Sequence, residues 1–552
     1  MRPEHVDAVV VGSGFGGAVS AYRLAEAGKS VVVLERGKAY APGSFPRSPA
    51  QMGKAFWDPP HGLHGMFDVW SFRGFDSLVS SGLGGGSLIY ANVLLRKDER
   101  WFVHEDPLPG GGFETWPVTR ADLDPHYDAV EAMLRPEPYP LDAPAYASTR
   151  KTVAMRDAAG KLGLDWQLPP LAVSFRPHAE AEPAIGLPIV EPSYGNVHGA
   201  ARSTCRLCGE CDIGCNDGAK NSLDHNYLSA ARSHGADLRT RHEVRGLRAL
   251  GSGGYEVAYV VHDDEGRDPS TLDVHRLTCD RLILAAGTYG TTYLLLRNRS
   301  RLPGLSAALG SRFCGNGDLL TFLLPGDGDE TPASFEASRG PVITSAVRVD
   351  DGPGTRGFYI EDGGYPGFTD WLVESGNVAS RLFRSVEFVG RWLLTLLGRW
   401  PDNRLGAELS RLLGDGTLSA GSLPLLGMGR DVPDGVMRLR GDLLDVDWTT
   451  ETSRAFFDGV RETMQDIAGE LGARYVDNPM WFFRRVITVH PLGGAPIGRH
   501  PGEGVCDPYG EVFGLPGLHV ADGAALPGPV GANPSLTIAA LADRMSTRLL
   551  EG

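Results

Sequence analysis

Short apolar runs, each flanked by small residues, recur from one end of the chain to the other. Four of these runs have the composition of short parallel strands buried on both faces: residues 7–11 (DAVVV), 31–34 (VVVL), 281–286 (RLILAA) and 518–521 (LHVA). Residues 18–27, between the first two runs, have the pattern of a helix, and Gly28 ends it. Apolar strands that alternate with helices predict an α/β domain.

Other parts of the chain follow different patterns. Residues 241–280 alternate between apolar and polar and carry the turn sequences GSGG and DDEG, which predicts a β-meander. Residues 382–400 place apolar side chains at helical spacing but also carry Arg384, Arg391 and Arg399. This segment predicts either a core-facing helix, or a lid or membrane-surface helix that guides a lipophilic substrate.

The glycine-rich segment 12–17 (GSGFGG) lies between the first strand and the first helix. Gly12 permits a tight turn, Gly14 lets the backbone approach a pyrophosphate, and Gly17 allows the helix to pack closely on the strand. The start of the helix offers N–H groups to phosphates. Glu35, 18 residues after Gly17, can accept hydrogen bonds from a ribose. Together these features predict a dinucleotide-binding turn.

The distribution of glycine-rich segments favours FAD over NAD as this dinucleotide. A second glycine loop occupies residues 81–88 (SGLGGGSL), and the runs ending near Gly287 and Gly523 also finish in small residues. NAD usually binds one contiguous unit, whereas a long, extended cofactor is contacted by segments from the whole chain.

Two short motifs near the carboxyl end carry candidate chemistry. His490 precedes the compact turn PLGG, and Asn533 precedes Pro534 in a constrained loop, just before a helix predicted to begin near Ser535. A neutral imidazole can take the hydroxyl proton of an alcohol while hydride leaves the carbon, and a fixed amide can hydrogen-bond the substrate oxygen.

Taken together, these motifs resemble those of the glucose–methanol–choline (GMC) FAD oxidoreductases, and within them the cholesterol-oxidase-like branch. The resemblance rests on residues 9–37, GLGGGSL, AAGT, HPLGG at 490–494 and residues 521–544. It implies extended FAD, oxidation of an alcohol by hydride transfer to flavin N5, and His490 and Asn533 as the catalytic pair. The implied FAD contacts are Gly12, Gly14, Gly17, Glu35, Gly84, Gly85, Gly86, Ser87, Val244, Ala286, Gly287, Asp522, Gly523, Asn533 and Pro534.

The chain also departs from the family pattern in two places. Cholesterol oxidases of this fold that also isomerise a double bond carry a catalytic glutamate between the substrate domain and the His motif. The corresponding position is expected near residues 415–420 (DGTLSA), which contain no glutamate. After the second glycine loop, the Asn-Gly of the family is replaced by Tyr90-Ala91, followed by Asn92.

Four of the seven cysteines form one run with the spacing C-x2-C-x2-C-x3-C: Cys205, Cys208, Cys211 and Cys215. This spacing resembles the ferredoxin run for a [4Fe–4S] cluster, but Asn216 stands where that run has proline. Three interpretations remain open: an iron–sulfur cluster, a structural zinc ion, and free thiols. Cys279, Cys314 and Cys506 are isolated and are expected to be buried thiols.

Charge and composition limit the classes of binding partner and the expected location of the protein. The formal net charge of −15 disfavours nucleic acid, and no run of 18 apolar residues predicts a spanning helix. The amino terminus lacks the apolar stretch of a secretion signal, and the cysteine pattern is not a disulfide framework, so we expect a cytoplasmic location.

These patterns predict two interleaved domains. A Rossmann-like α/β FAD-binding domain is expected from residues 1–130, 200–325 and 480–552, and an α+β substrate domain on an antiparallel sheet from 131–199 and 326–480. The predicted reaction is oxidation of a bulky, hydrophobic, sterol-like alcohol, with oxygen or an electron-carrier protein as acceptor. The alternatives are a lyase with a structural flavin and an electron-transfer subunit with a [4Fe–4S] cluster.

Overall fold

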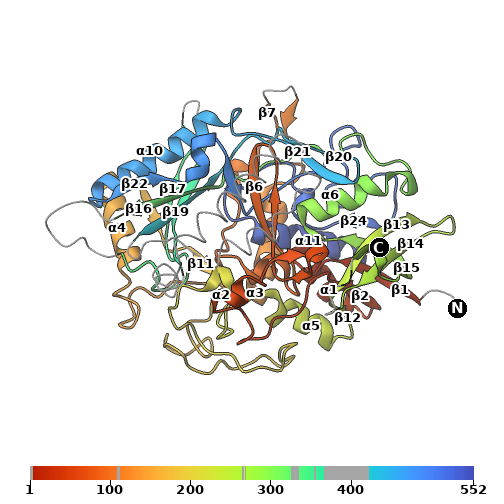
Figure 1. The fold of residues 1–552 in the computed structure, drawn as a ribbon, viewed down its shortest axis with the longest axis horizontal. Coiled ribbons are helices and arrows are strands. Elements are labelled where there is room, and N and C mark those ends of the chain that lie inside the picture. The colour runs from red at the N-terminus through yellow and green to blue at the C-terminus, as the bar shows by residue number, and fades with distance from the viewer. Residues whose placement is uncertain are drawn as a thin grey trace.

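Two large β-sheets organise the chain (Figure 1). The computed structural model describes residues 4–108, 112–263, 267, 269–324, 335–352, 356–365 and 422–551. In Figure 1 the first sheet lies at the lower right, and the second, with α4 and α10, lies at the upper left.

The first sheet is mostly parallel and contains the strands predicted from the apolar runs. Its order is β12 (Asp237–Arg239), β2 (Val31–Leu34), β1 (Glu4–Val11), β15 (His275–Leu284), β14 (Tyr255–Val261) and β13 (His242–Ala249), and β24 (Leu518–Val520) pairs with the end of β15. The strands β12, β2, β1, β15 and β24 run parallel, whereas β13, β14 and β15 form the predicted antiparallel meander. β2 is buried along its whole length, as expected for a strand covered on both faces.

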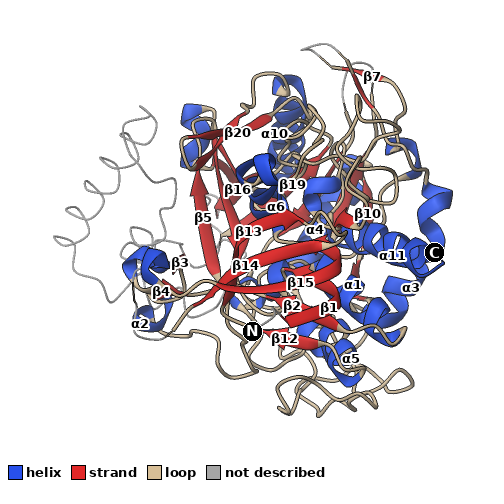
Figure 2. Cartoon of the chain, turned by 90° about the vertical axis from the view of Figure 1, so that its right-hand side faces the viewer, coloured by secondary structure: helices blue, strands red, loops and turns tan. Residues whose placement is uncertain are grey.

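Helices cover this sheet and bring its loops together. Figure 2 shows α1 (Phe15–Glu26), α3 (Arg120–Leu134), α5 (Tyr227–Ser233) and α11 (Ser535–Glu551) gathered beside it. The helix α6 (Gly287–Arg297) follows β15 directly. Gly16 lets α1 pack against the segment after β24, because a Cβ there would lie 1.7 Å from the carbonyl oxygen of Ala521.

The second sheet is antiparallel throughout. Its order is β10 (Asp165–Gln167), β17 (Ala346–Val349), β18 (Phe358–Asp362), β19 (Leu423–Gly429), β16 (Leu319–Leu324) and β22 (Arg474–Asp477). The helices α4 (Arg150–Leu162) and α10 (Arg454–Glu470) pack against it and share its apolar core. Five consecutive residues of β18 are buried, so this strand is covered on both faces.

Smaller elements connect the two sheets. A three-stranded sheet of β5 (Phe67–Ser71), β6 (Phe75–Ser80) and β23 (Val486–Thr488) leads into the His490 turn. The remaining pairs are β3 (Trp57–Asp58) with β4 (Leu63–His64), β7 (Asp106–Pro107) with β8 (Phe113–Glu114), β9 (Glu137–Pro138) with β11 (Pro170–Leu171), and β20 (Val436–Arg440) with β21 (Leu443–Asp447). A short helix, α2, covers Pro49–Met52.

The predicted fold class is confirmed in its architecture: an α/β domain on a mostly parallel sheet is interleaved with an α+β domain on an antiparallel sheet. The structure differs from the predicted ranges at two edges. β16 ends before residue 325 but belongs to the second sheet, and α3 crosses the predicted edge at residue 130 while it packs on α11. The segments 382–400 and 415–420 lie outside the described residues. None of the helices in the described part of the chain has both the length and the apolar character needed to span a bilayer.

Candidate active site

A cavity of about 900 Å³ lies where loops of both sheets meet. Thirteen of the residues expected to bind FAD or to act in catalysis line it: Gly12, Gly14, Glu35, Gly85, Gly86, Val244, Ala286, Gly287, His490, Asp522, Gly523, Asn533 and Pro534. Segments separated by hundreds of residues in the sequence therefore face one space.

The two glycine loops touch each other at the edge of this cavity. A Cβ on Gly85 would lie 2.6 Å from the Cα of Gly14, whereas the nearest atom to a Cβ on Gly14 would be 4.0 Å away. Gly14 therefore faces open space at the start of α1, where helix N–H groups are free for a phosphate. Gly17 does not line the cavity; its Cβ would lie 2.1 Å from the Gly12 oxygen, in agreement with a packing role.

Gly84 and Ser87 also lie behind the cavity surface. The Ser87 hydroxyl donates to the carbonyl oxygen of Gly84 (2.7 Å) and accepts from the Leu223 N–H (3.0 Å). Gly84 has φ +110°, a conformation that favours glycine. These two residues hold the shape of the second glycine loop.

Glu35 and Val244 lie at the carboxyl end of β2 and on β13. Both Glu35 oxygens are fixed: Oε2 accepts from the Ser13 hydroxyl (2.6 Å) and Oε1 from the Gly37 N–H (2.8 Å). Val244 stands at an irregularity in the pairing of β13 with β14. A rigid carboxylate beside an open cavity is suited to hold a ribose.

Asp522 forms hydrogen bonds with the two other turns of small residues, the one at Gly287 and the one at Ala524. Its Oδ2 accepts from the Gly287 N–H (2.8 Å) and the Thr291 hydroxyl (2.5 Å), and its Oδ1 accepts from the Ala524 N–H (2.9 Å). Burial raises the pKa of Asp522 to about 6, although these donors oppose the shift. The carboxyl group therefore anchors both turns to one point of the cavity wall.

His490 is held by a buried aspartate. Its Nδ1 lies 2.7 Å from Oδ1 of Asp318, while Oδ2 accepts the N–H groups of Val489 (2.7 Å) and His490 (3.0 Å) and the Thr488 hydroxyl (3.0 Å). The Asp318 side chain is fully buried. A carboxylate at Nδ1 places the proton on that nitrogen and leaves Nε2 as an acceptor.

Asn533 contacts a second buried acid, Glu361. The Asn533 amide nitrogen donates to Oε2 of Glu361 at 3.4 Å. Burial raises the pKa of Glu361 to about 8; the Asn533 contact opposes this, and the nearby Asp362 and Asp318 charges add to it. Within the described structure, Oδ1 of Asn533 and Oε1 of Glu361 are buried without a hydrogen-bond partner. The amide oxygen can only accept a hydrogen bond, whereas the carboxyl oxygen can accept one or, when protonated, donate one.

The sequence patterns missed both acids, Asp318 and Glu361. Residues 415–420, where the family's glutamate position is expected, lie outside the described residues, whereas the structure brings Glu361 of β18 to Asn533. Its place was visible in the sequence only as a charged residue inside an apolar strand, FYIED. Asp318 had a weaker signal, because it simply precedes the apolar run of β16.

The segment that departs from the family pattern still lines the cavity. Tyr90, Ala91 and Asn92 all face it. Asn92 has φ +73°, and both polar atoms of its buried amide lack a partner in the described structure. Orphaned amide atoms at a cavity wall fit a polar ring system such as that of a flavin.

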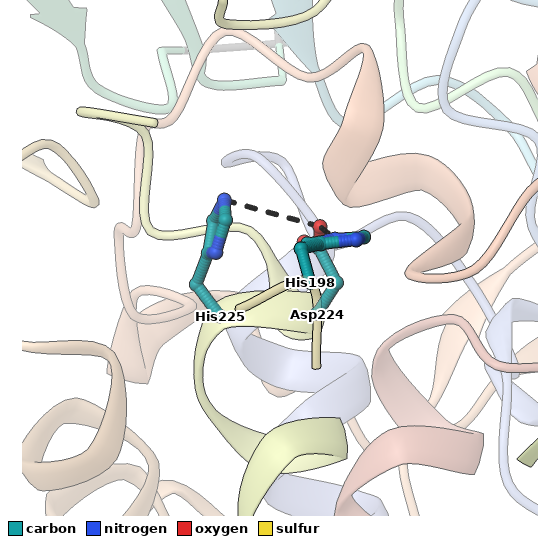
Figure 3. Close-up of side chains that lie close together, drawn as sticks. All are labelled: His198, Asp224 and His225. Atoms are coloured by element: carbon teal, nitrogen blue, oxygen red, sulfur yellow. Dashed lines mark hydrogen bonds and ion pairs between the residues drawn. The ribbon is translucent and has the colours of Figure 1, made fainter. Parts of the chain in front are cut away.

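A buried trio lies next to the second glycine loop (Figure 3). The Nε2 atoms of His198 and His225 lie 2.7 and 3.9 Å from Oδ2 of Asp224. Burial lowers the pKa of His225 to about 4, while the Asp224 charge opposes this. Since Leu223, the neighbour of Asp224, donates to Ser87, the trio supports the glycine loop.

The four clustered cysteines lie outside the large cavity but beside it. They line a separate small cavity together with Lys220. Cys211 precedes Asp212, which lines the large cavity. Cys279, Cys314 and Cys506 are buried, as expected.

Comparisons with known proteins agree with this geometry. Family models described as "FAD dependent oxidoreductase" and "GMC oxidoreductase" match residues 7–142 and 432–542. The chain is 32% identical to a cholesterol oxidase of Mycobacterium tuberculosis over 99% of this chain and 91% of the relative. It is 29% identical to a cholesterol oxidase of Acinetobacter baumannii over 98% and 93%.

A solved structure, pyridoxine 4-oxidase from Mesorbium loti, shares the fold with TM-score 0.57 and 17% identity over 99% of both chains. The matches define an FAD-dependent oxidoreductase that acts on CH–OH donors. The chain belongs to the GMC oxidoreductase family.

Proposed function

We propose that the protein oxidises a bulky, apolar, sterol-like secondary alcohol to the ketone, with His490 as the general base. The observation that carries this proposal is the His490–Asp318 pair at the wall of a cavity that Asn533 also lines. The names of the two relatives, both cholesterol oxidases, support the sterol class.

The residues present fit FAD as the group that accepts hydride. Gly14 would face its pyrophosphate and Glu35 its ribose, and Ser535 at the start of α11 lines the same cavity. Asn92 supplies orphaned amide atoms in the same cavity. When bound, FAD accepts the hydride that leaves the carbinol carbon.

His490 supplies the proton transfer that oxidation needs. With Nδ1 bound to Asp318, Nε2 takes the hydroxyl proton of the alcohol as the C–H bond breaks. The Asp318 carboxylate stabilises the imidazolium that forms. The Asn533 side-chain nitrogen, which carries a second N–H besides the one directed at Glu361, donates to the substrate oxygen and orients it.

The proposal assigns a second proton transfer to Glu361. In a sterol whose ring double bond lies one carbon beyond the new ketone, a carboxylate can take a proton from the carbon between them. It can return the proton at the far end of the double bond, which leaves an isomer and an unchanged glutamate. We include this isomerisation in the proposal because Glu361 is the acid that contacts Asn533.

The second sheet offers an apolar wall suited to a sterol. Leu320 of β16 and Leu426 of β19 face the cavity, with Val342, Ile343 and Pro424 beside them. Apolar surface of this kind binds fused hydrocarbon rings through burial from water.

Mixing the purified, FAD-loaded protein with a 3β-hydroxysterol without oxygen tests the proposal. We expect bleaching of the flavin absorbance, and a roughly 10²-fold or larger slowing in His490→Ala with FAD retained. Unchanged reduction in His490→Ala would remove His490 as the base. Bleaching by short polar alcohols but by no sterol would overturn the substrate class.

A further inference from the structure

The run of four cysteines lines one small pocket. Cys205, Cys208, Cys211 and Cys215 all line one cavity of about 20 Å³. The loop is tied down: Gly209 donates to the Gly340 oxygen at 2.9 Å, and Gly340 donates to the Leu207 oxygen at 3.2 Å. The fold therefore arranges four thiols from within eleven residues around one small space.

Backbone N–H groups point at three of the sulfurs. Leu207 donates to Sγ of Cys205 at 3.4 Å, Glu210 to Cys208, and Val342 to Cys211. Leu207 itself has φ +60°, a conformation uncommon for leucine. Amide donors aimed at sulfur stabilise anionic thiolates, and they tune metal-bound thiolates in the same way.

Two buried lysines stand beside this site. Nζ of Lys220 donates to the carbonyl oxygens of Cys211 (2.8 Å) and Leu88 (3.1 Å), and Nζ of Lys151 donates to those of Pro341 (2.8 Å) and Val342 (2.6 Å). In the part of the chain that the structure describes, no carboxylate forms a salt bridge with either lysine. The charge of Asp212 acts on both lysines and that of buried Asp362 acts on Lys151, and a metal cluster would add further negative charge beside them.

The spacing of the sulfurs distinguishes between metals. Four thiolates around one zinc ion, with Zn–S near 2.3 Å, would lie about 3.8 Å apart. Over the described residues, three or more ligand atoms come within 4.8 Å of one another only in the His198, Asp224 and His225 trio, so no three of the cysteine sulfurs do. A cluster with a separate iron for each thiolate accepts the wider spacing.

We propose that Cys205, Cys208, Cys211 and Cys215 bind a [4Fe–4S] cluster whose negative charge is balanced by Lys220 and Lys151. The cluster site shares a wall with the large cavity. Asp212 and Val342 line the large cavity beside Cys211, and the Lys220 ammonium lies 4.8 Å from the ring centre of Tyr90, which also lines it.

The position beside the large cavity suits a cluster that exchanges single electrons. This role rests on the proposed alcohol oxidation, whereas the binding of the cluster does not depend on it. Each alcohol oxidised to a ketone releases two protons and two electrons. A cluster passes one electron at a time, so two molecules of an external one-electron carrier protein would each be reduced once, and the protons would go to solvent.

Metal analysis of the full-length protein tests the site without any substrate. After anaerobic purification and incubation with ferrous iron and sulfide, we expect about four irons and four acid-labile sulfides per chain. Dithionite should bleach broad visible absorption beneath the flavin bands and produce an electron paramagnetic resonance signal. Cys208→Ser should lose most of the iron, whereas Cys279→Ser, the same change at an isolated buried thiol, should keep it.

The flavin bands report folding in both variants. Wild-type protein with no more iron than Cys208→Ser overturns the proposal, and so does stoichiometric zinc in place of iron. Because neither readout depends on alcohol oxidation, a failure here is distinct from a failure of the proposed function.

Discussion

At the scale of single residues, Asp318 determines what His490 can do. Oδ1 of this carboxylate contacts Nδ1 of the imidazole, and Oδ2 accepts three hydrogen bonds from residues 488–490 of the same turn. The aspartate thus fixes both the ring and the backbone that carries it. It acts through His490, so it is a positioning residue.

Asp318→Asn tests whether Asp318 orients the His490 imidazole or only packs against it. The amide would donate to Nδ1 and force the proton of neutral imidazole onto Nε2, the wrong nitrogen for a base. We expect the limiting rate of flavin reduction to fall roughly 10²-fold or more while the alcohol still binds, because the wrong nitrogen faces the substrate. Stopped-flow reduction at a series of alcohol concentrations measures the rate and the binding separately.

Ser77→Ala is the matched control, because it removes a buried hydrogen bond to the carbonyl oxygen of Thr488, the last residue of β23 before the His490 turn. It should keep both the limiting rate and the binding of the alcohol. A merely structural role for Asp318 would weaken FAD and alcohol binding together with the rate, and that result would contradict the positioning role.

At the scale of elements, the junction of β1 with α1 is built to leave room for a ligand. The nearest atom to a Cβ on Gly14 would be 4.0 Å away, although the neighbouring glycines are tightly packed. The space is therefore kept at one position, at the start of a helix.

Gly14→Val should fill that space and block the pyrophosphate. We expect protein that purifies without bound flavin and gains no yellow colour on addition of FAD. Gly160→Val, within α4 and with no atom near its added side chain, is the control and should keep FAD. A fully loaded, yellow Gly14→Val protein would place the phosphate site elsewhere.

The elements that could be predicted from the sequence were those whose residues are contiguous. The strand, glycines, helix and acid of the first turn lie within some thirty residues, so local pattern suffices. Asp318 and Glu361 each contact partners 172 residues away. No local periodicity encodes such a pairing, because it depends on how the second sheet docks on the first.

At the scale of the whole molecule, the cavity exists because the two sheets meet, and the chain buries acids where they meet. Burial raises the pKa of Glu361 and of Asp431 to about 8. Such groups favour the folded state while they are protonated. Their contribution is complete below the unfolded pKa, near 4 to 4.5, and is lost as pH rises through about 8.

Glu361→Gln should therefore change how stability depends on pH. Because glutamine cannot ionise, the variant does not lose the stability that wild type loses as this group ionises between about pH 4.5 and about pH 8. The free energy of unfolding of the variant should gain on wild type by at most about 1.4 kcal/mol per pH unit in that window, and the gain should stop beyond it. Urea unfolding of both FAD-loaded proteins at about pH 5 and about pH 8 measures the difference. Glu462→Gln, at an exposed position on α10, is the control, and its free energy of unfolding should change with pH as that of wild type does. A Glu361→Gln curve that also runs parallel would show that Glu361 is ionised in the folded protein across this range.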